Sequence, residues 1–572
     1  MRRLRDPGGL SYGAGAALRG EPLTRPPMPR EFHHMAATPR VHDTPPSAPR
    51  AVSRRFAVPG ALASAAVIGS SGAAAAADDD LSAYLPARFK GTDTLLSRHD
   101  RHLVSRFSYG VTPDLARDVR KAGGAQAWFE RQLRPSSVKD KKAGRLQAWW
   151  PSLKRGPREL WERQITGVEG GYEVMNNYAR WSMMRRMVSK RQVFEVMAEF
   201  WENHLHVPAL GDAQFTHRVD YGNQIREHAL GRFDEMLLAT TTHPAMLIYL
   251  DAAESTKEHP NENLGRELLE LHTVGEGSYN EKDVKGSARI LTGWSVDMYE
   301  SWRPEYHEDD HYLGTVKVKG FKDKNRKANG KKLTADYLRY LAHHPDTAEH
   351  VAAKLCEKFI GDKASKSLVK KLAKVYLEND TAIVPVLRAL VDSDQFRHSI
   401  DDKVRDPAED LVATYRALRI DVLPPPGDED SYNGSAIAAM IWQVGGIGLV
   451  PFSWASPDGQ PLDNESWSSP GRLMGSMDVH WQLAHGHYPD EAVRYKQPMK
   501  WMPGPAVRFD ELVDHLSQQL LHRHSDARLL KACAKATDVK PKDYIIEDHE
   551  LIQWKFGRLL STILDSPAHY SR

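Results

Sequence analysis

The sequence predicts a mostly α-helical globular protein with a multi-helix, bundle-like fold, long loops and at most a small β-hairpin. The 572-residue chain is 41% hydrophobic and 27% charged, which is a globular composition long enough for one large or two medium domains. Apolar residues recur at helical spacing along most of the chain. Strand-like alternation is sparse and is best at residues 313–321, where we expect a small hairpin or a loop.

The helices can be placed in order by their apolar periodicity and by their start and stop residues. Thr112 and Pro113 provide an N-cap and a first helical residue, and Gly123 with Gly124 separates this helix from the next one. One long amphipathic run extends from Glu173 to His206, and Pro244 divides the next helical region into two pieces. Further helical patterns lie at 333–343, 345–360, 365–376, 381–392, 407–418, 434–444, 508–521, 526–535 and 550–565.

Two stretches without periodicity organise the body of the protein. Residues 421–432 form a proline-rich acidic loop, which we expect to separate a main helical domain at 95–420 from a C-terminal helical lobe at 433–572. Residues 450–475 are rich in Pro, Gly, Ser and Trp, and we expect a long ordered loop or an active-site flap there.

The N-terminal region has the composition of a targeting segment. Residues 1–77 hold ten arginines, no lysine and four acidic residues. The pair Arg54 and Arg55 precedes a short apolar run that ends in small residues, and this order is typical of a twin-arginine signal peptide at 53–77. An alanine-rich disordered tail is the alternative. We expect residues 1–52 to be a disordered extension, and Met35 is an alternative start.

The leader predicts where the protein goes. We expect a secreted protein, extracellular or associated with the cell wall, that leaves by the twin-arginine route. No later segment reaches eighteen consecutive apolar residues, so we expect no integral membrane segment once the signal is removed. Beyond residue 77 the chain has 68 basic and 71 acidic residues, and this balance gives no electrostatic reason to expect nucleic-acid binding.

The cysteines exclude one class of metal site. Cys356 and Cys533 lie in separate helical patterns without a C-x-x-C spacing, so a zinc–thiolate site is not expected. They could pair outside the cell or remain two buried thiols.

The first candidate site is the acidic helix "NENLGRELLEL". At 100° per residue, Asn263, Glu267 and Glu270 fall within about 60° of one another, with leucines on both sides. A carboxylate pair among leucines must be paired, protonated or bound to a metal if it is buried. We therefore predict Glu267, Glu270 and, from a nearby helix end, Asp251 as catalytic candidates. A structural network with Arg266 or Arg289 is the alternative.

Other residues complete the predicted site. Asn263, Arg266 and Trp294 are candidates for lining the pocket and binding a cofactor. His204, in "FWENHLHV", shares a helix face with apolar residues, and we predict His204, Glu267 and Glu270 as ligands of a divalent metal. The alternative for His204 is a core histidine with satisfied hydrogen bonds. His307 to His311, in "YHEDDHYLG", form a loop that either binds a metal or is solvated.

Four motifs, in order, resemble a bacterial family, the domain of unknown function (DUF) 1800. They are "FWENHL", "HPAMLIYLD", "NENLGRELLELHTVGEGSYNEKDVKGSARILTGW" and "LAHHPDTAEHVAAKLCEKFIGD", and the resemblance covers roughly residues 95–565. It implies export and a co-exported sulfatase-like or phosphatase-like partner, but it implies no reaction.

Two functions from different classes follow. The first is an exported carboxylate- or metal-dependent hydrolytic enzyme that acts on an extracellular substrate. Trp294, Trp302, Trp454 and Trp467 would suit a carbohydrate or polymer substrate, although core packing is the alternative for them. The second is a non-catalytic secreted helical scaffold or partner, in which the acids are structural. The P-loop, G-x-S-x-G, H-E-x-x-H and G-x-G-x-x-G patterns are absent from the sequence, so the enzyme classes that use them lack support.

Overall fold

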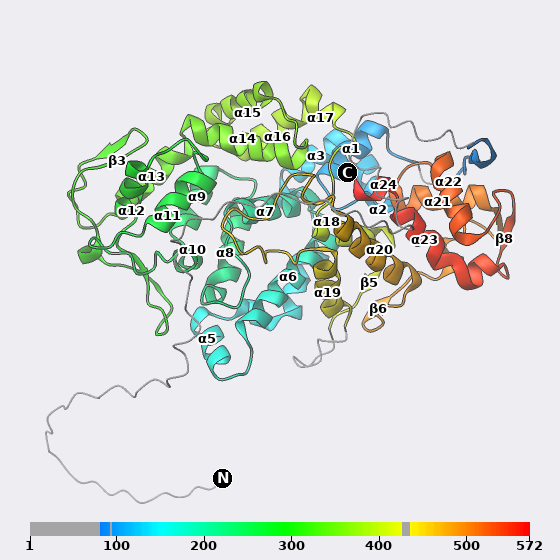
Figure 1. Ribbon diagram of the computed structural model, residues 1–572, viewed down its shortest axis with the longest axis horizontal. Helices are drawn as coiled ribbons and strands as arrows, with labels where there is room; N and C mark the ends of the chain where they lie inside the picture. Colours follow the sequence, from blue (N-terminus) through cyan, green and yellow to red (C-terminus); the bar gives the residue numbers. More distant parts are fainter. Residues whose placement is uncertain (1–80, 92–93, 426–434) are drawn as a thin grey trace, which may run out of the picture. The chain divides into compact units, whose positions relative to one another are not determined.

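Helices dominate the protein, and the mostly α prediction is confirmed. The computed structural model describes residues 81–91, 94–425 and 435–572 (Figure 1), so the predicted leader and part of the acidic loop lie outside the described residues. The first twelve helices are α1 (Arg98–Arg106), α2 (Pro113–Lys121), α3 (Ala125–Gln132), α4 (Lys141–Arg145), α5 (Pro157–Ile165), α6 (Gly171–Val188), α7 (Gln192–His204), α8 (Phe215–His228), α9 (Phe233–Thr241), α10 (Pro244–Tyr249), α11 (Glu262–Glu267) and α12 (Glu281–Ile290).

Twelve more α-helices follow within the described ranges. They are α13 (Lys331–Ala342), α14 (Pro345–Phe359), α15 (Lys366–Glu378), α16 (Ile383–Val391), α17 (Asp394–His398), α18 (Pro407–Ala417), α19 (Ala436–Ile447), α20 (Pro470–His485), α21 (Phe509–Leu521), α22 (Ala527–Thr537), α23 (Phe556–Leu564) and α24 (Pro567–Tyr570). Figure 1 shows α14, α15 and α16 side by side, and α14 and α16 each pack against α15.

The strands form small antiparallel pairs between helices. The predicted hairpin is confirmed as β3 (Val316–Val318) and β4 (Phe321–Asp323). Three further pairs join short segments: β1 (Trp294–Val296) with β2 (Pro304–Tyr306), β5 (Asp421–Val422) with β6 (Val493–Arg494), and β7 (Ala506–Arg508) with β8 (Tyr544–Ile546).

The expected start and stop residues act as capping chemistry requires. Thr112 accepts a hydrogen bond from Leu115 N and Pro113 opens α2, while Pro244 opens α10. The long run from Glu173 to His206 is two helices rather than one, because α6 ends before Ser189. The Ser189 hydroxyl bonds Asp140 at 2.5 Å and accepts from Arg191 N at 3.0 Å, and such local bonds compete with the helix.

The acidic helix of the sequence contains a change of helix type. α11 ends at Glu267, and residues Leu268–His272 form a π-helical segment, η6. α11 also approaches α12 closely, since a Cβ on Gly265 would lie 2.9 Å from Ala288 N. π-helical turns inside a helix are rare and often occur at functional sites.

α18 is central to the packing of the chain. It contacts α6 from the predicted main domain and α19, α20 and α21 from the predicted C-terminal lobe.

The two cysteines, Cys356 in α14 and Cys533 in α22, are free and buried. Of the two predicted alternatives, a disulfide or two buried thiols, the structure has the two buried thiols. Burial raises the pKa of the Cys356 thiol to about 12. Among the described residues, no helix combines the length and the apolar character that a membrane crossing needs.

A candidate metal centre in a histidine pocket

A cavity of about 330 Å³ lies where the end of α7, the π-helical segment and α14 meet. We call it the histidine pocket. Its polar lining includes His204, Glu270, His350 and Lys354, and one wall is the loop from Asp458 to Asp463. The sequence predicted two of these residues, His204 and Glu270, as members of one site, and the structure brings them into the same cavity.

Two histidines of the pocket are oriented by neighbouring backbone carbonyls. His204 Nε2 lies 3.2 Å from the carbonyl of His272, and His350 Nδ1 lies 2.8 Å from the carbonyl of Thr273. A ring nitrogen beside a carbonyl must carry the proton, so each ring keeps a lone pair on its other nitrogen. The ring centroids are 5.6 Å apart. Fixing one nitrogen on a carbonyl is how proteins orient metal-ligating histidines.

Both rings are held in the neutral form. Burial lowers the pKa of His204 well below its usual value, and His350 adds to the effect. Burial also lowers the pKa of His350. Neutral imidazoles are the form that binds metals.

A third histidine lies beside this pair without any hydrogen-bond partner. His272 ends the π-helical segment, is 0% exposed, and has neither ring nitrogen in a hydrogen bond. Burial lowers its pKa to about 3, with smaller effects from His350 and His206. A fully buried imidazole with two unused nitrogens is costly unless a ligand engages it.

The loop over the pocket is held to α7, which favours the ordered loop over the flap, the two alternatives predicted for residues 450–475; the last residues of that range belong to α20. Asn203, next to His204, accepts from Gln460 N at 2.7 Å and donates to the Gln460 carbonyl at 2.9 Å. Gly459 has φ +73°, and a Cβ there would lie 2.3 Å from the Asn203 carbonyl, so only glycine permits this close approach. The loop is therefore fixed to the helix that carries His204.

Glu267 and Glu270 do not both line the histidine pocket. Glu270 lines the cavity and accepts a short hydrogen bond from the Tyr279 hydroxyl, whereas Glu267 is half-buried outside the lining. Burial raises the pKa of Glu267, and Glu270 raises it further. The predicted stripe assumed 100° per residue, but the π-helical segment begins directly after Glu267 and changes the rotation per residue.

Four other candidates lie outside the pocket. Asp251 and Asn263 are exposed, and Arg266 pairs with Glu281 through two bonds of 2.8 Å. Trp294 donates to Thr334 at 3.2 Å. The alternative prediction was a structural network in which Arg266 or Arg289 pairs with Glu267 and Glu270. Arg266 pairs with Glu281 instead.

Three further sequence candidates, Trp302, Trp467 and His311, are buried. Trp302 and Trp467 are 1% and 8% exposed, which favours the core alternative for these two tryptophans. His311 is buried, and its two nitrogens lie 3.0 Å from the Thr292 carbonyl and 3.0 Å from Asn325 Oδ1. Its ring is therefore occupied on both sides. The sequence did not identify His272 as a site residue, because a regular helix would direct it about 180° away from Asn263. It did not identify His350 either, because no local pattern links that residue to the acidic helix.

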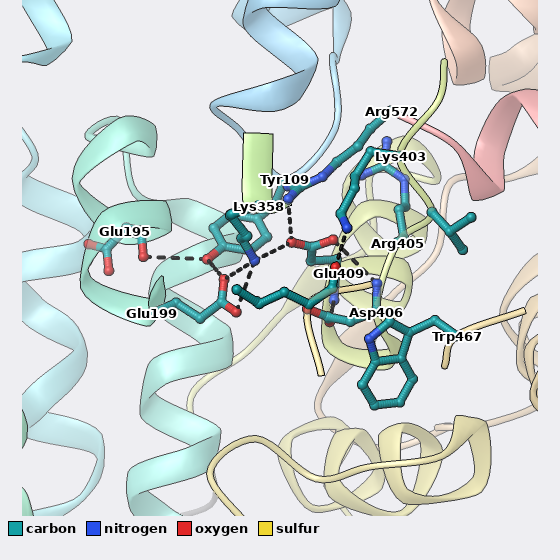
Figure 2. Close-up of polar contacts among 12 residues, drawn as sticks. Tyr109, Glu195, Glu199, Lys358, Lys403, Arg405, Asp406, Glu409, Trp467 and Arg572 are labelled. Carbon is teal, nitrogen blue, oxygen red and sulfur yellow. Dashed lines mark hydrogen bonds and ion pairs between the residues drawn. The ribbon is translucent and has the colours of Figure 1, made fainter. Parts of the chain in front are cut away.

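Two other clusters resemble metal sites in composition, and both already contain their counter-charges. Glu199, Asp406 and Glu409 place carboxylate oxygens within 4.8 Å of one another. Lys358 Nζ lies 3.2 Å from Glu199 and 2.9 Å from Glu409, and Arg572 lies 2.8 Å from Glu409 (Figure 2). The lysine ammonium thus bridges two of the three carboxylates, Glu199 and Glu409, that a metal ion would otherwise need to join.

The second cluster is an ion-pair network around Asp410. His480 bonds Asp410 through Nε2 at 3.2 Å and Asp565 through Nδ1 at 2.8 Å, while Arg472 and Ser476 also bond Asp410 at 3.1 and 2.6 Å. Burial lowers the pKa of His480, but the two carboxylates outweigh it and raise the pKa to about 9. A protonated imidazole has no lone pair for a metal.

This network predicts a pH dependence of stability. The pKa of His480 is about 9 in the folded state, against 6.5 as its ordinary value, so its contribution is complete below pH 6.5 and is lost as pH rises toward 9. We expect the free energy of unfolding of the wild type to fall by roughly 3 kcal/mol more between pH 6 and pH 9 than that of His480→Gln. Urea denaturation at both pH values measures this, and equal falls in the two proteins would contradict it.

The protein is a mostly α globular protein with histidines and a carboxylate in one cavity. Residues 102–570 match the family described as "Protein of unknown function (DUF1800)", and the protein belongs to that family. The resemblance seen in the sequence is thereby confirmed. No curated protein and no solved structure matches the chain.

Proposed function

We propose that the protein is an exported, metal-dependent hydrolytic enzyme whose metal centre is the histidine pocket. The observation that carries the proposal is the pair of neutral imidazoles, His204 and His350, fixed on consecutive carbonyls and lining one cavity. Glu270 adds a carboxylate to the lining. His272 is not a lining residue, but its carbonyl holds His204 and its two buried ring nitrogens have no partners, so we include it as a ligand that would have to turn toward the ion. Imidazole with carboxylate is a donor set that suits zinc or iron.

The other groups of the pocket fit hydrolytic chemistry. A metal in such a site lowers the pKa of a bound water and polarises a carbonyl or phosphoryl oxygen. Glu276, Glu357 and Asp458 line the same cavity and are the candidates for a general base. Lys354 also lines it and would stabilise negative charge that develops on the substrate.

Metal binding requires the ligands to converge. Within the described ranges, the two groups whose three ligand atoms lie within 4.8 Å of one another are the Lys358-bridged carboxylates and the Asp410 network. His204, His350 and Glu270 do not form such a group. The proposal therefore includes a closure of side chains around the ion.

Metal analysis of the purified protein tests the proposal. We expect about one zinc or iron ion per chain in the wild type, and loss of that ion in His350→Ala. His398→Ala is the matched control, since His398 is an exposed histidine outside the pocket. Chelator-sensitive turnover of p-nitrophenyl acetate or bis(p-nitrophenyl) phosphate tests the hydrolytic part. A wild-type protein that binds neither zinc nor iron after reconstitution would contradict the proposal.

Export by the twin-arginine route is part of the same proposal. The support is the sequence of residues 53–77, with Arg54 and Arg55 before the apolar run. Replacing both arginines by lysine is expected to keep the protein inside the producing cell. Equal amounts of both proteins in the culture supernatant would contradict this route.

A scaffold is the second candidate, and an exposed helix face favours it. On α20, Met474, Met477 and Trp481 are 67%, 37% and 45% exposed and fall on one stripe. α20 packs against α19, which exposes Trp442. Met and Trp are enriched in protein interfaces. If the protein carries no metal, Trp442→Ala and Trp481→Ala would be expected to weaken capture of a co-exported partner.

A further inference from the structure

A second cavity, larger than the histidine pocket, is a basic groove on another part of the chain. It has a volume of about 790 Å³ and is lined by residues of α2, α3, α6, α18 and β5. Volumes of this size accommodate small organic ligands or a segment of a polymer. None of the histidine-pocket residues lines it, so the inference does not depend on the proposed function.

The charge of the groove departs from that of the whole protein. Its lining has eight cationic side chains and three acidic ones, an excess of five positive charges. The chain beyond residue 77, in contrast, has 68 basic and 71 acidic residues. The excess is therefore a local feature of this cavity.

The three acids of the groove are already engaged. Lys190 pairs with Asp118 at 3.7 Å, Lys142 pairs with Asp421 at 3.8 Å, and Arg117 pairs with Asp114. Five cations remain without a carboxylate partner in the lining: Lys121, Arg131, Lys139, Arg416 and Arg419. Like charges gathered in a cavity raise the local concentration of counter-ions.

Arg416 provides a second, independent observation. Its terminal nitrogens donate to the backbone carbonyls of Met187 at 2.7 Å and Gly110 at 3.3 Å, while its Nε is buried and has no hydrogen-bond partner. Burial lowers its pKa to about 10, with a smaller effect from Arg405. Asp114, which lines the groove, raises the pKa again but does not outweigh burial, and its carboxylate pairs with Arg117. A largely desolvated guanidinium that has no ion pair of its own is costly, and an anion in the groove would offset that cost.

We propose that the basic groove binds a ligand that carries at least two phosphate, sulfate or carboxylate groups. A single anionic group would leave most of the five cations without an anionic partner, whereas a multiply charged ligand would engage several of them. Arginine and lysine together suit such ligands, because arginine binds oxyanions through two parallel hydrogen bonds and lysine acts as a point charge.

Calorimetric titration with three probes tests the proposal: inorganic sulfate, tripolyphosphate and a heparin-derived hexasaccharide. We expect at least one multiply charged probe to bind about 10-fold more tightly than sulfate, with an affinity that falls as salt rises. Tighter binding of the hexasaccharide would indicate an anionic polymer, and tighter binding of tripolyphosphate a small phosphorylated ligand. No binding of either multiply charged probe would overturn the proposal.

A pair of lysine variants locates the binding. The double variant Lys121→Gln, Lys139→Gln removes two exposed groove charges and is expected to weaken binding at least 10-fold at unchanged Tm. The control Lys370→Gln, Lys374→Gln removes two exposed charges from α15 and is expected to change affinity less than 2-fold. Both variants keep the histidine pocket, so binding through a metal there would persist in both. An equal loss in the two variants would overturn the assignment to the groove.

Discussion

Replacing Lys358 by methionine is expected to lower the free energy of unfolding by about 3–5 kcal/mol, because it leaves two buried carboxylates without their shared cation. Lys358 is 2% exposed and bonds both Glu199 and Glu409. Burial lowers the pKa of the amine, but the two carboxylates outweigh burial and the pKa is raised. The amine is therefore charged in the folded protein, and Lys358→Met removes a positive charge from the interior.

Two further variants separate this effect from a loss of packing. In Lys358→Met, Glu409 keeps its ion pair with Arg572, whereas Glu199 loses its ion pair with Lys358. Adding Glu199→Gln removes that carboxylate charge, so we expect the double variant to recover part of the lost stability. Lys374→Met changes an exposed lysine and is expected to stay within about 0.5 kcal/mol of the wild type. Urea denaturation at pH 7 measures all three. A loss below about 1 kcal/mol in Lys358→Met would show that the carboxylates do not need this lysine.

The fold was largely predictable from local sequence signals. Apolar periodicity and capping residues act within a few positions, so the helices around Thr112 and Pro244 are found where the sequence places them. The hairpin at 316–323 overlaps the predicted range 313–321 but extends two residues beyond it. The break between α6 and α7 was not, because the Ser189 hydroxyl reaches Asp140, which lies 49 positions away. The sequence does not show that contact.

The candidate site was predictable only in part. His204 and Glu270 were named from composition and face, and both line the histidine pocket. His350 comes from α14, and its orientation depends on a carbonyl 77 positions away, so no local pattern identifies it. The π-helical segment also changes the regular rotation that was expected to direct Glu267 and Glu270 into one pocket, although the two carboxylates stay close enough for Glu270 to raise the pKa of Glu267. Long-range contacts and irregular backbone are what single-sequence reasoning omits here.

His272 allows a test that separates a metal ligand from a structural residue. We expect His272→Leu to raise the free energy of unfolding of the metal-free protein by about 1–2 kcal/mol, because it removes two buried nitrogens that have no partner. We expect the same variant to lower the affinity for zinc or iron by at least about 100-fold, since changes even to the groups that support metal ligands cost 10–100-fold. Urea denaturation in chelator and competition titration of the metal measure the two effects.

His311→Leu is the matched control for that experiment. His311 is also buried, but both of its ring nitrogens are hydrogen-bonded, so its loss strands the Asn325 amide oxygen and is expected to destabilise the protein. The two leucine variants should therefore shift stability in opposite directions, while only His272→Leu weakens metal binding. A destabilising His272→Leu with unchanged metal affinity would make His272 a core residue and remove it from the proposed centre. The buried imidazole of His272 is expected to lower the stability of the wild type, and His272→Leu is expected to restore that stability while it weakens metal binding. Such a trade-off between stability and function is expected at a functional site.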